Sequence, residues 1–140
     1  MSFKKSNRKS SKKTKKKTKK KIKMTDYKEH LSEPWFSLMN LGLKTVEGRK
    51  NKGKWKDMKI GEIIEWYNLD FLERKFTTRV IGKSTYSTFR EYLENEGLDR
   101  CLPGINPDYG MEHALSVYYK YFTKEDELEY GVVAIRLEKI

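Results

Sequence analysis

The sequence predicts an α+β fold, a small mixed β-barrel with flanking helices that follows a disordered N-terminal tail. The first observation is a change of composition at Met24: Lys, Ser and Thr dominate before it, whereas aromatic and aliphatic residues reach the density of a folded domain from Tyr27 onward. The second is that predicted strands and helices alternate without the regular rhythm of a doubly wound parallel sheet. A chain of 140 residues suits one such domain. We therefore expect a tail over residues 1–23 and one domain over residues 24–140.

A short helix opens the domain. It is predicted to begin near Ser32, with Glu33 and Pro34 in its first turn, where a missing backbone N–H costs nothing. Gly42 suits the left-handed position that closes such a helix. Its apolar face comprises Trp35, Leu38 and Met39.

Runs of β-branched and aromatic residues predict four strands after this helix. They are predicted over residues 44–50, 63–67, 76–86 and 132–137. Between the first two, residues 53–58 are predicted to form a loop in which Trp55 covers an edge of the core.

Three helices are predicted between the last two strands. One runs from Ser87 or Thr88 to Glu96 and ends at Gly97. The next is capped by Asp108, after turn residues 102–108. Its apolar residues recur at helical spacing, and they are Met111, Ala114, Leu115, Tyr118 and Phe122. The last begins at Thr123, with acidic residues near its positive end.

The charge of the chain is concentrated in the tail. Of 31 basic residues, 13 lie in residues 1–23, which hold no acid, so the remaining 18 face 20 acidic residues and leave the domain at −2. The tail lysines are therefore predicted to contact nucleic-acid phosphates without sequence preference or to direct the protein to the nucleus, with a merely solubilising extension as the alternative. The contact residues would be Lys12, Lys13, Lys15, Lys16, Lys17, Lys19, Lys20 and Lys21.

The single cysteine, Cys101, forms no internal disulfide, which favours a reducing intracellular compartment. It is expected to be a small buried residue rather than a nucleophile. His30 and His113 have no spaced Cys or His partner, so neither a metal site nor another cofactor is expected. No run has the length of a membrane span, and a monomer without a membrane partner is favoured.

The most informative segment is the charged strand after Gly42. Strand alternation places Thr45, Glu47 and Arg49 on one face, with Lys44 at the junction before them. In one interpretation this face is the wall of a cleft in which Arg49 contacts a phosphate or a base edge. In the other it is a solvated face with a weak ion pair.

Several separated elements resemble the ASCH domain, a member of the PUA-like superfold. Residues 42–49 match its Gly-x-Lys-Thr-x-Glu-x-Arg pattern, and residues 60–64 are similar to its Val-Gly-Asp-x-Ile element. The Leu-Pro-Gly loop at residues 102–104, the aromatic helix at residues 118–122 and the strand at residues 130–135 also resemble the family. The similarity covers residues 33–140, and it implies a PUA-like barrel whose first strand lines a pocket.

The resemblance implies an RNA-binding module with a nucleotide-sized polar cleft. The residues implied for nucleic-acid binding are Lys44, Thr45, Glu47 and Arg49, to which we add Tyr121 because it lies off the apolar helical stripe. Trp35, Trp55 and Tyr119 are further aromatic candidates, with Trp35 expected in the core.

Two other functions remain open. Some bacterial ASCH proteins hydrolyse N4-acetylcytidine with a lysine and a threonine three residues later, but Glu47 stands at that later position here. An enzyme acting on a modified nucleoside or on RNA would use Lys44 and Glu47 as catalytic residues. Alternatively, the barrel binds a protein partner and the tail tethers it to nucleic acid.

Overall fold

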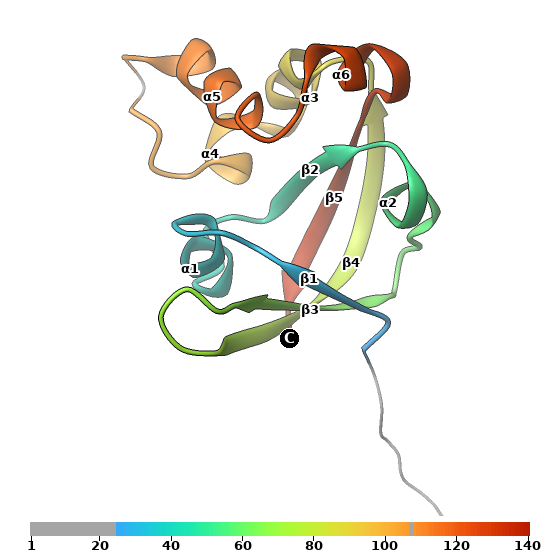
Figure 1. The fold of residues 1–140 in the computed structure, drawn as a ribbon, viewed down its shortest axis with the longest axis vertical. Coiled ribbons are helices and arrows are strands. Elements are labelled where there is room, and N and C mark those ends of the chain that lie inside the picture. Colours follow the sequence, from blue (N-terminus) through green and yellow to red (C-terminus); the bar gives the residue numbers. More distant parts are fainter. Residues whose placement is uncertain (1–24, 107) are drawn as a thin grey trace, which may run out of the picture.

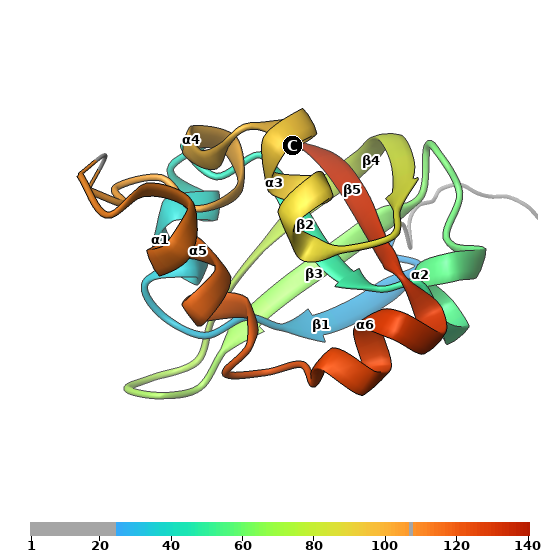
Figure 2. The ribbon, with the colours of Figure 1, turned by 90° about the horizontal axis from the view of Figure 1, so that it is seen from above.

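The structure is a computed structural model that describes residues 25–106 and 108–140, so the predicted tail lies outside the described residues. A five-stranded mixed sheet has the strand order β1-β3-β4-β5-β2. Its strands are β1 (Tyr27–His30), β2 (Val46–Lys50), β3 (Ile63–Asn68), β4 (Arg74–Tyr86) and β5 (Val132–Lys139). The β1–β3 pair is parallel and the other pairs are antiparallel. The predicted α+β barrel is confirmed as a strongly curled sheet with β1 and β2 at its edges (Figures 1 and 2).

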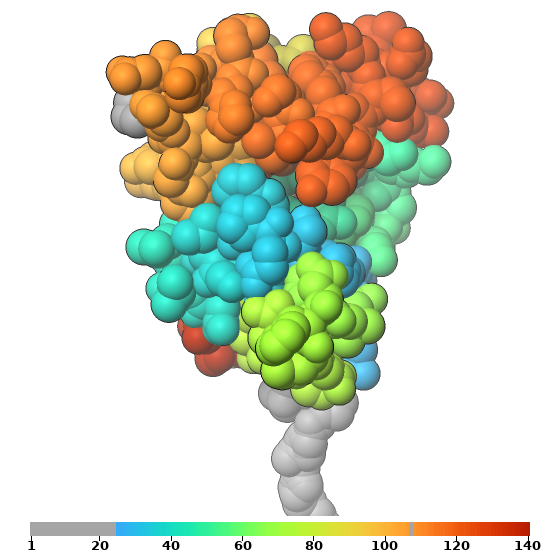
Figure 3. Space-filling model, turned by 60° about the vertical axis from the view of Figure 1, so that its left-hand side comes forward, coloured from blue at the N-terminus to red at the C-terminus, as the bar shows by residue number. Residues whose placement is uncertain are grey.

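Helices surround this sheet unevenly. They are α1 (Trp35–Asn40), α2 (Gly53–Asp57), α3 (Phe89–Glu96), α4 (Leu98–Cys101), α5 (Gly110–Tyr118) and α6 (Lys124–Tyr130). Helices α3 to α6 gather at one end of the sheet, and α1 and α2 lie on its two flanks (Figure 1). The β3–β4 hairpin projects below α1 (Figure 3). No helix in the described ranges is long and apolar enough to cross a membrane.

Strand β5 separates two hydrophobic clusters because its side chains alternate between the two faces of the sheet. Val133 and Ile135 join the cluster inside the curl, where Trp55 stacks on Trp66 with ring centroids 6.2 Å apart. Val132 and Ala134 join the cluster under the helices. Each large side chain buried in this way contributes about 1.5–3 kcal/mol.

The N-terminal caps of two helices agree with the sequence. The Thr88 hydroxyl accepts from the Glu91 N–H at 3.1 Å, and the Thr123 hydroxyl accepts from the Asp126 N–H at 3.0 Å. Each satisfies a backbone donor that the helix leaves without a partner. The helices begin at Phe89 and Lys124, within two residues of the predicted starts at Ser87 or Thr88 and at Thr123.

The predicted cap at Asp108 is wrong. Tyr109 precedes the first residue of α5, and no side chain caps this helix. The carboxamide oxygen of Asn106 accepts from the Asp108 N–H at 2.9 Å, so Asn106 organises the turn instead. Helix α5 ends at Tyr118, and Phe122 reaches the helical cluster from the turn beyond it, with its ring centroid 5.1 Å from that of Phe89.

Other differences concern short elements. The predicted loop at residues 53–58 contains the single-turn helix α2, although Trp55 does cover the core as expected. In α1 the fully buried residues are Phe36 and Met39, whereas Trp35 and Leu38 are only half-buried. Strand β1 and helix α4 were not predicted, because β1 is mostly polar and α4 has only four residues.

Candidate functional site

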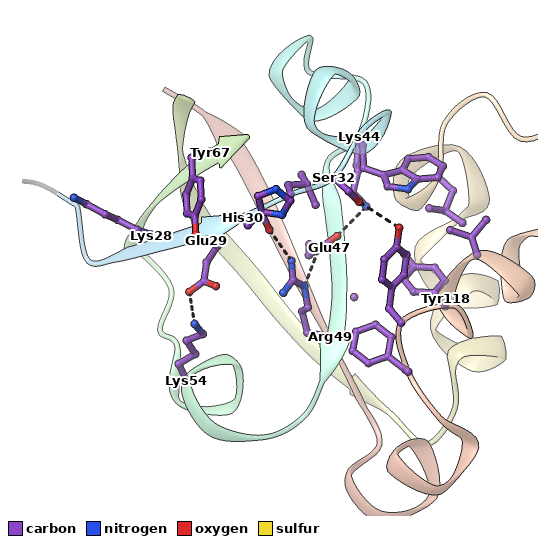
Figure 4. A pocket seen from close by; sticks show the side chains of 17 residues that line it. Lys28, Glu29, His30, Ser32, Lys44, Glu47, Arg49, Lys54, Tyr67 and Tyr118 are labelled. Atoms are coloured by element: carbon purple, nitrogen blue, oxygen red, sulfur yellow. Dashed lines mark hydrogen bonds and ion pairs between the residues drawn. The ribbon is translucent and has the colours of Figure 1, made fainter. Parts of the chain in front are cut away.

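A cavity of about 570 Å³ opens between the edge strands β1 and β2. The segment after α5 covers it, and side chains from all three regions point toward it (Figure 4). Its aromatic lining comprises Trp35, Tyr67, Tyr118, Tyr121 and Phe122. Its volume lies in the range of about 300–1,000 Å³ that small-ligand pockets occupy. The curl of the sheet thus creates a binding-sized space where its two edges meet.

Lys44 lies buried at the back of this cavity. Its Nζ donates to the carbonyl oxygens of Val46 at 2.8 Å and Cys101 at 2.6 Å, and lies 3.1 Å from Oε1 of Glu47. The three N–H groups of an ammonium thus have three acceptors. This arrangement suits Lys44 to fixing the position of Glu47 rather than to attacking a substrate.

Glu47 joins the two cations of the motif. While Oε1 faces Lys44, Oε2 accepts from Nε of Arg49 at 2.7 Å. Burial raises the pKa of the Glu47 carboxyl, but the charges and hydrogen bonds of Lys44 and Arg49 outweigh burial and hold that pKa below its usual value. Glu47 is therefore a fixed carboxylate and a hydrogen-bond acceptor.

Arg49 spans the gap between the sheet edges. Its Cζ lies 4.4 Å from the ring centroid of Trp55, which supports the guanidinium from one side. Its Nη2 makes a long contact of 3.5 Å with the carbonyl oxygen of His30 on β1. With 22% of its side chain exposed, Arg49 presents its remaining donors to the cavity (Figure 4).

The rim of the cavity is made by residues far apart in the sequence. The Tyr121 hydroxyl and Ser32 Oγ lie 3.3 Å apart, and the Tyr121 ring is largely exposed. Toward α2, Lys54 forms an ion pair of 2.8 Å with the buried carboxylate of Glu29. The mouth therefore combines an aromatic surface with charged groups.

This fold is found in known proteins. The family model described as ASCH domain matches residues 30–140. The chain belongs to the ASCH domain family. It is 34% identical to the hypothetical protein PH0355, whose crystal structure matches with a TM-score of 0.71, covering 81% of this chain and 98% of that one. It is 33% identical to protein PF0455 from Pyrococcus furiosus, whose solution structure has a TM-score of 0.66, covering 81% and 96% of the two chains. Comparison with curated proteins gives no significant match.

This ASCH domain brings most of the predicted site residues together. Lys44, Glu47 and Arg49 form one bonded cluster, and Tyr121 lies at the rim of the same cavity. Thr45 is not among the lining residues. Its backbone joins the start of β2 to Arg100 and Leu137 through hydrogen bonds of 3.0 and 2.9 Å. The predicted tail contacts lie outside the described residues.

The remaining candidates have clear positions in the ASCH fold. Trp35 packs on both hydrophobic clusters and also lines the cavity. The Tyr119 hydroxyl donates a hydrogen bond of 2.9 Å to the Glu127 carboxylate, and neither residue lines the cavity. Cys101 is fully buried, and burial raises the pKa of its thiol to about 11, which agrees with an inert core residue. Among residues 25–106 and 108–140, no three His, Cys, Asp or Glu side chains converge as metal ligands.

The sequence did not indicate the opposite wall of the site. Lys28, Glu29 and His30 line the cavity from β1, and Lys54 does so from α2. The positions of the three β1 residues depend on the parallel pairing of β1 with β3, a partner distant in the chain. The one local signal is a polar strand-length segment directly before the first helix.

Proposed function

We propose that this ASCH domain binds RNA by accepting one nucleotide in the cavity between β1 and β2. The observation that carries the proposal is the fixed Glu47–Arg49 pair inside a cavity with aromatic walls. Aromatic side chains stack on base faces, while a carboxylate and a guanidinium pair with donors and acceptors on base edges or with phosphate. A preformed pair of opposite charges is thus suited to a polar, planar ligand.

The contacts of Lys44 support binding rather than catalysis. A lysine that acts as base or nucleophile needs a free lone pair, whereas Lys44 is surrounded by three acceptors. The ASCH hydrolases that this chain resembles have a threonine at the position of Glu47. Here Glu47 pairs with both Lys44 and Arg49. We therefore favour a binding module over a nucleoside amidohydrolase or a ribonuclease. The aromatic lining of the cavity favours a nucleotide ligand over a protein partner.

Replacement of Arg49 by Gln tests this proposal. The Arg49→Gln protein should bind nucleoside monophosphates and short single-stranded RNA about tenfold more weakly, because one charge-assisted hydrogen bond is lost. Fluorescence anisotropy measures the affinity, and thermal unfolding verifies that the variant folds. The control is Arg79→Gln, since Arg79 makes only an exposed pair with Glu138 on the sheet. Equal affinity of the wild type and Arg49→Gln would exclude the cavity as the binding site.

We also propose that residues 1–23 supply nonspecific contacts to nucleic-acid phosphates. The remainder of the chain has a net charge of −2, which disfavours long-range attraction of RNA by the domain alone. The lysine-rich segment is linked to β1, the strand whose His30 lines the cavity. A phosphate contact made by this segment raises the effective concentration of the same RNA at the cavity.

Removal of residues 1–23 should abolish most of the salt dependence of RNA binding. The reason is that each lost phosphate contact lowers the slope of log K against log salt by about 0.7 for single strands. Affinity for a nucleoside monophosphate should stay within twofold, because that ligand occupies the cavity only. A shortened protein that keeps the full salt slope for RNA would assign the phosphate contacts to the domain.

A further inference from the structure

A second hollow lies directly beside the cavity. It has a volume of about 360 Å³ and shares Arg49, Lys54 and Phe122 with the cavity. Within the described part of the chain, its charged lining is entirely cationic, made of Arg49, Lys50, Lys52 and Lys54. Trp55 and Phe122 give it an apolar floor. We call this hollow, at the end of β2 and the start of α2, the lysine groove.

The cations of the lysine groove are held in place but remain accessible. Nζ of Lys50 lies 3.4 Å from Asp126, in a pair whose two side chains are each about a third exposed. Nζ of Lys52 lies 4.7 Å from the ring centroid of Tyr130. Such exposed contacts are weak in water, so a phosphate can compete for these ammonium groups. The Tyr130 ring keeps Lys52 near the groove without neutralising it.

We infer that the ligand of this ASCH domain is a single-stranded oligonucleotide rather than a free nucleotide, and that the lysine groove binds the phosphate next to the nucleotide in the cavity. This inference rests on the proposed function of the cavity. The two hollows are adjacent, because Arg49, Lys54 and Phe122 line both, so one strand can reach both. A chain of cations beside an aromatic pocket is the arrangement with which proteins follow a single-stranded backbone. A free nucleotide would leave the lysine groove empty.

The test compares ligands of different length on the full chain. The double variant Lys50→Gln, Lys52→Gln should bind a trinucleotide of RNA about tenfold more weakly, with a salt slope reduced by about 0.7, because the contact with one phosphate is lost. Its affinity for a nucleoside monophosphate should be unchanged. The matched control is Lys59→Gln, Lys75→Gln, which removes the same charge from exposed residues outside both hollows.

The outcomes separate the groove from the cavity. If the groove variant, Lys50→Gln, Lys52→Gln, binds the trinucleotide as tightly as its control does, the inference about the lysine groove is wrong. It is also wrong if the wild-type protein binds the mononucleotide and the trinucleotide equally well.

The variant Tyr121→Ala reports on the cavity, since Tyr121 does not line the groove. If Tyr121→Ala weakens both ligands while the groove variant weakens neither, the cavity proposal stands alone. If Tyr121→Ala weakens neither, the cavity proposal fails, and the groove inference fails with it. A poly-glutamate peptide that binds the groove as tightly as RNA does would indicate an acidic protein partner instead.

Discussion

Replacement of Glu47 by Gln should lower the free energy of unfolding by about 3 kcal/mol, because the buried cation Lys44 then has no counter-charge. The Lys44 side chain is only 1% exposed and has Glu47 as its counter-charge. The amide of Gln would also place a donor group among the donors of Lys44 and Arg49. Urea unfolding monitored by tryptophan fluorescence measures the loss.

Three further variants, Glu138→Gln, Lys44→Met and the double variant Lys44→Met, Glu47→Gln, test whether the loss comes from the ion pair. Glu138→Gln removes a carboxylate from the exposed pair with Arg79 and should change stability by less than about 0.5 kcal/mol. The double variant Lys44→Met, Glu47→Gln should lose less than the two single losses combined, since neither charge is then left alone. Additive losses would mean that Lys44 and Glu47 are not coupled.

Replacement of Gly48 by Ala should cost up to about 3 kcal/mol, the upper part of the usual range for overpacking a core. A Cβ at Gly48 would lie 2.5 Å from Cζ of Tyr92 and 2.8 Å from its hydroxyl oxygen. Tyr92 has little room to move, because its ring is fully buried and its hydroxyl lies 2.8 Å from that of Tyr118. The same unfolding measurement detects the loss.

The control for this substitution is Gly82→Ala. A Cβ at Gly82 would meet chiefly Nη1 of Arg136 at 2.8 Å, the end of a flexible side chain that is 36% exposed. Arg136 donates to Glu96 through Nε at 3.0 Å and Nη2 at 2.9 Å, so a small shift of Nη1 that keeps these bonds makes room for the methyl group, and the loss should be smaller. A small loss at both glycines would show that Tyr92 moves aside and that Gly48 is not required for close packing beneath β2.

Local patterns predicted those parts of the fold whose stabilising contacts are themselves local. Thr88 and Thr123 each cap a helix within three residues, and β5 is a nearly continuous apolar run. Strand β1 differs, because its few residues are mainly polar and its ladder partner lies beyond α1 and β2. Its pairing depends on the curl of the whole sheet, which no short segment encodes.

The same division between local and long-range contacts applies to the candidate site. Glu47 and Arg49 lie two residues apart on one strand, so the alternation of strand side chains predicted that both lie on the polar wall. The engagement of Lys44 depends on the carbonyl of Cys101 in α4, a short helix remote in sequence. Spacing alone therefore left Lys44 open as a catalytic base, and only the assembled fold shows its acceptors.

The two sheet edges that meet at the cavity also carry the kind of side chain that opposes aggregation. Unpaired edge strands invite addition of a strand from another molecule, and natural proteins oppose this with charged side chains along such edges. Here Lys28 and Glu29 occupy one edge, Arg49 and Lys50 the other, and Arg49 reaches toward His30 across the space between them. An intruding strand would have to displace these charges and enter a space closed over by the segment after α5. The charged groups that make the cavity polar are thus also of the kind that opposes edge-to-edge pairing of sheets.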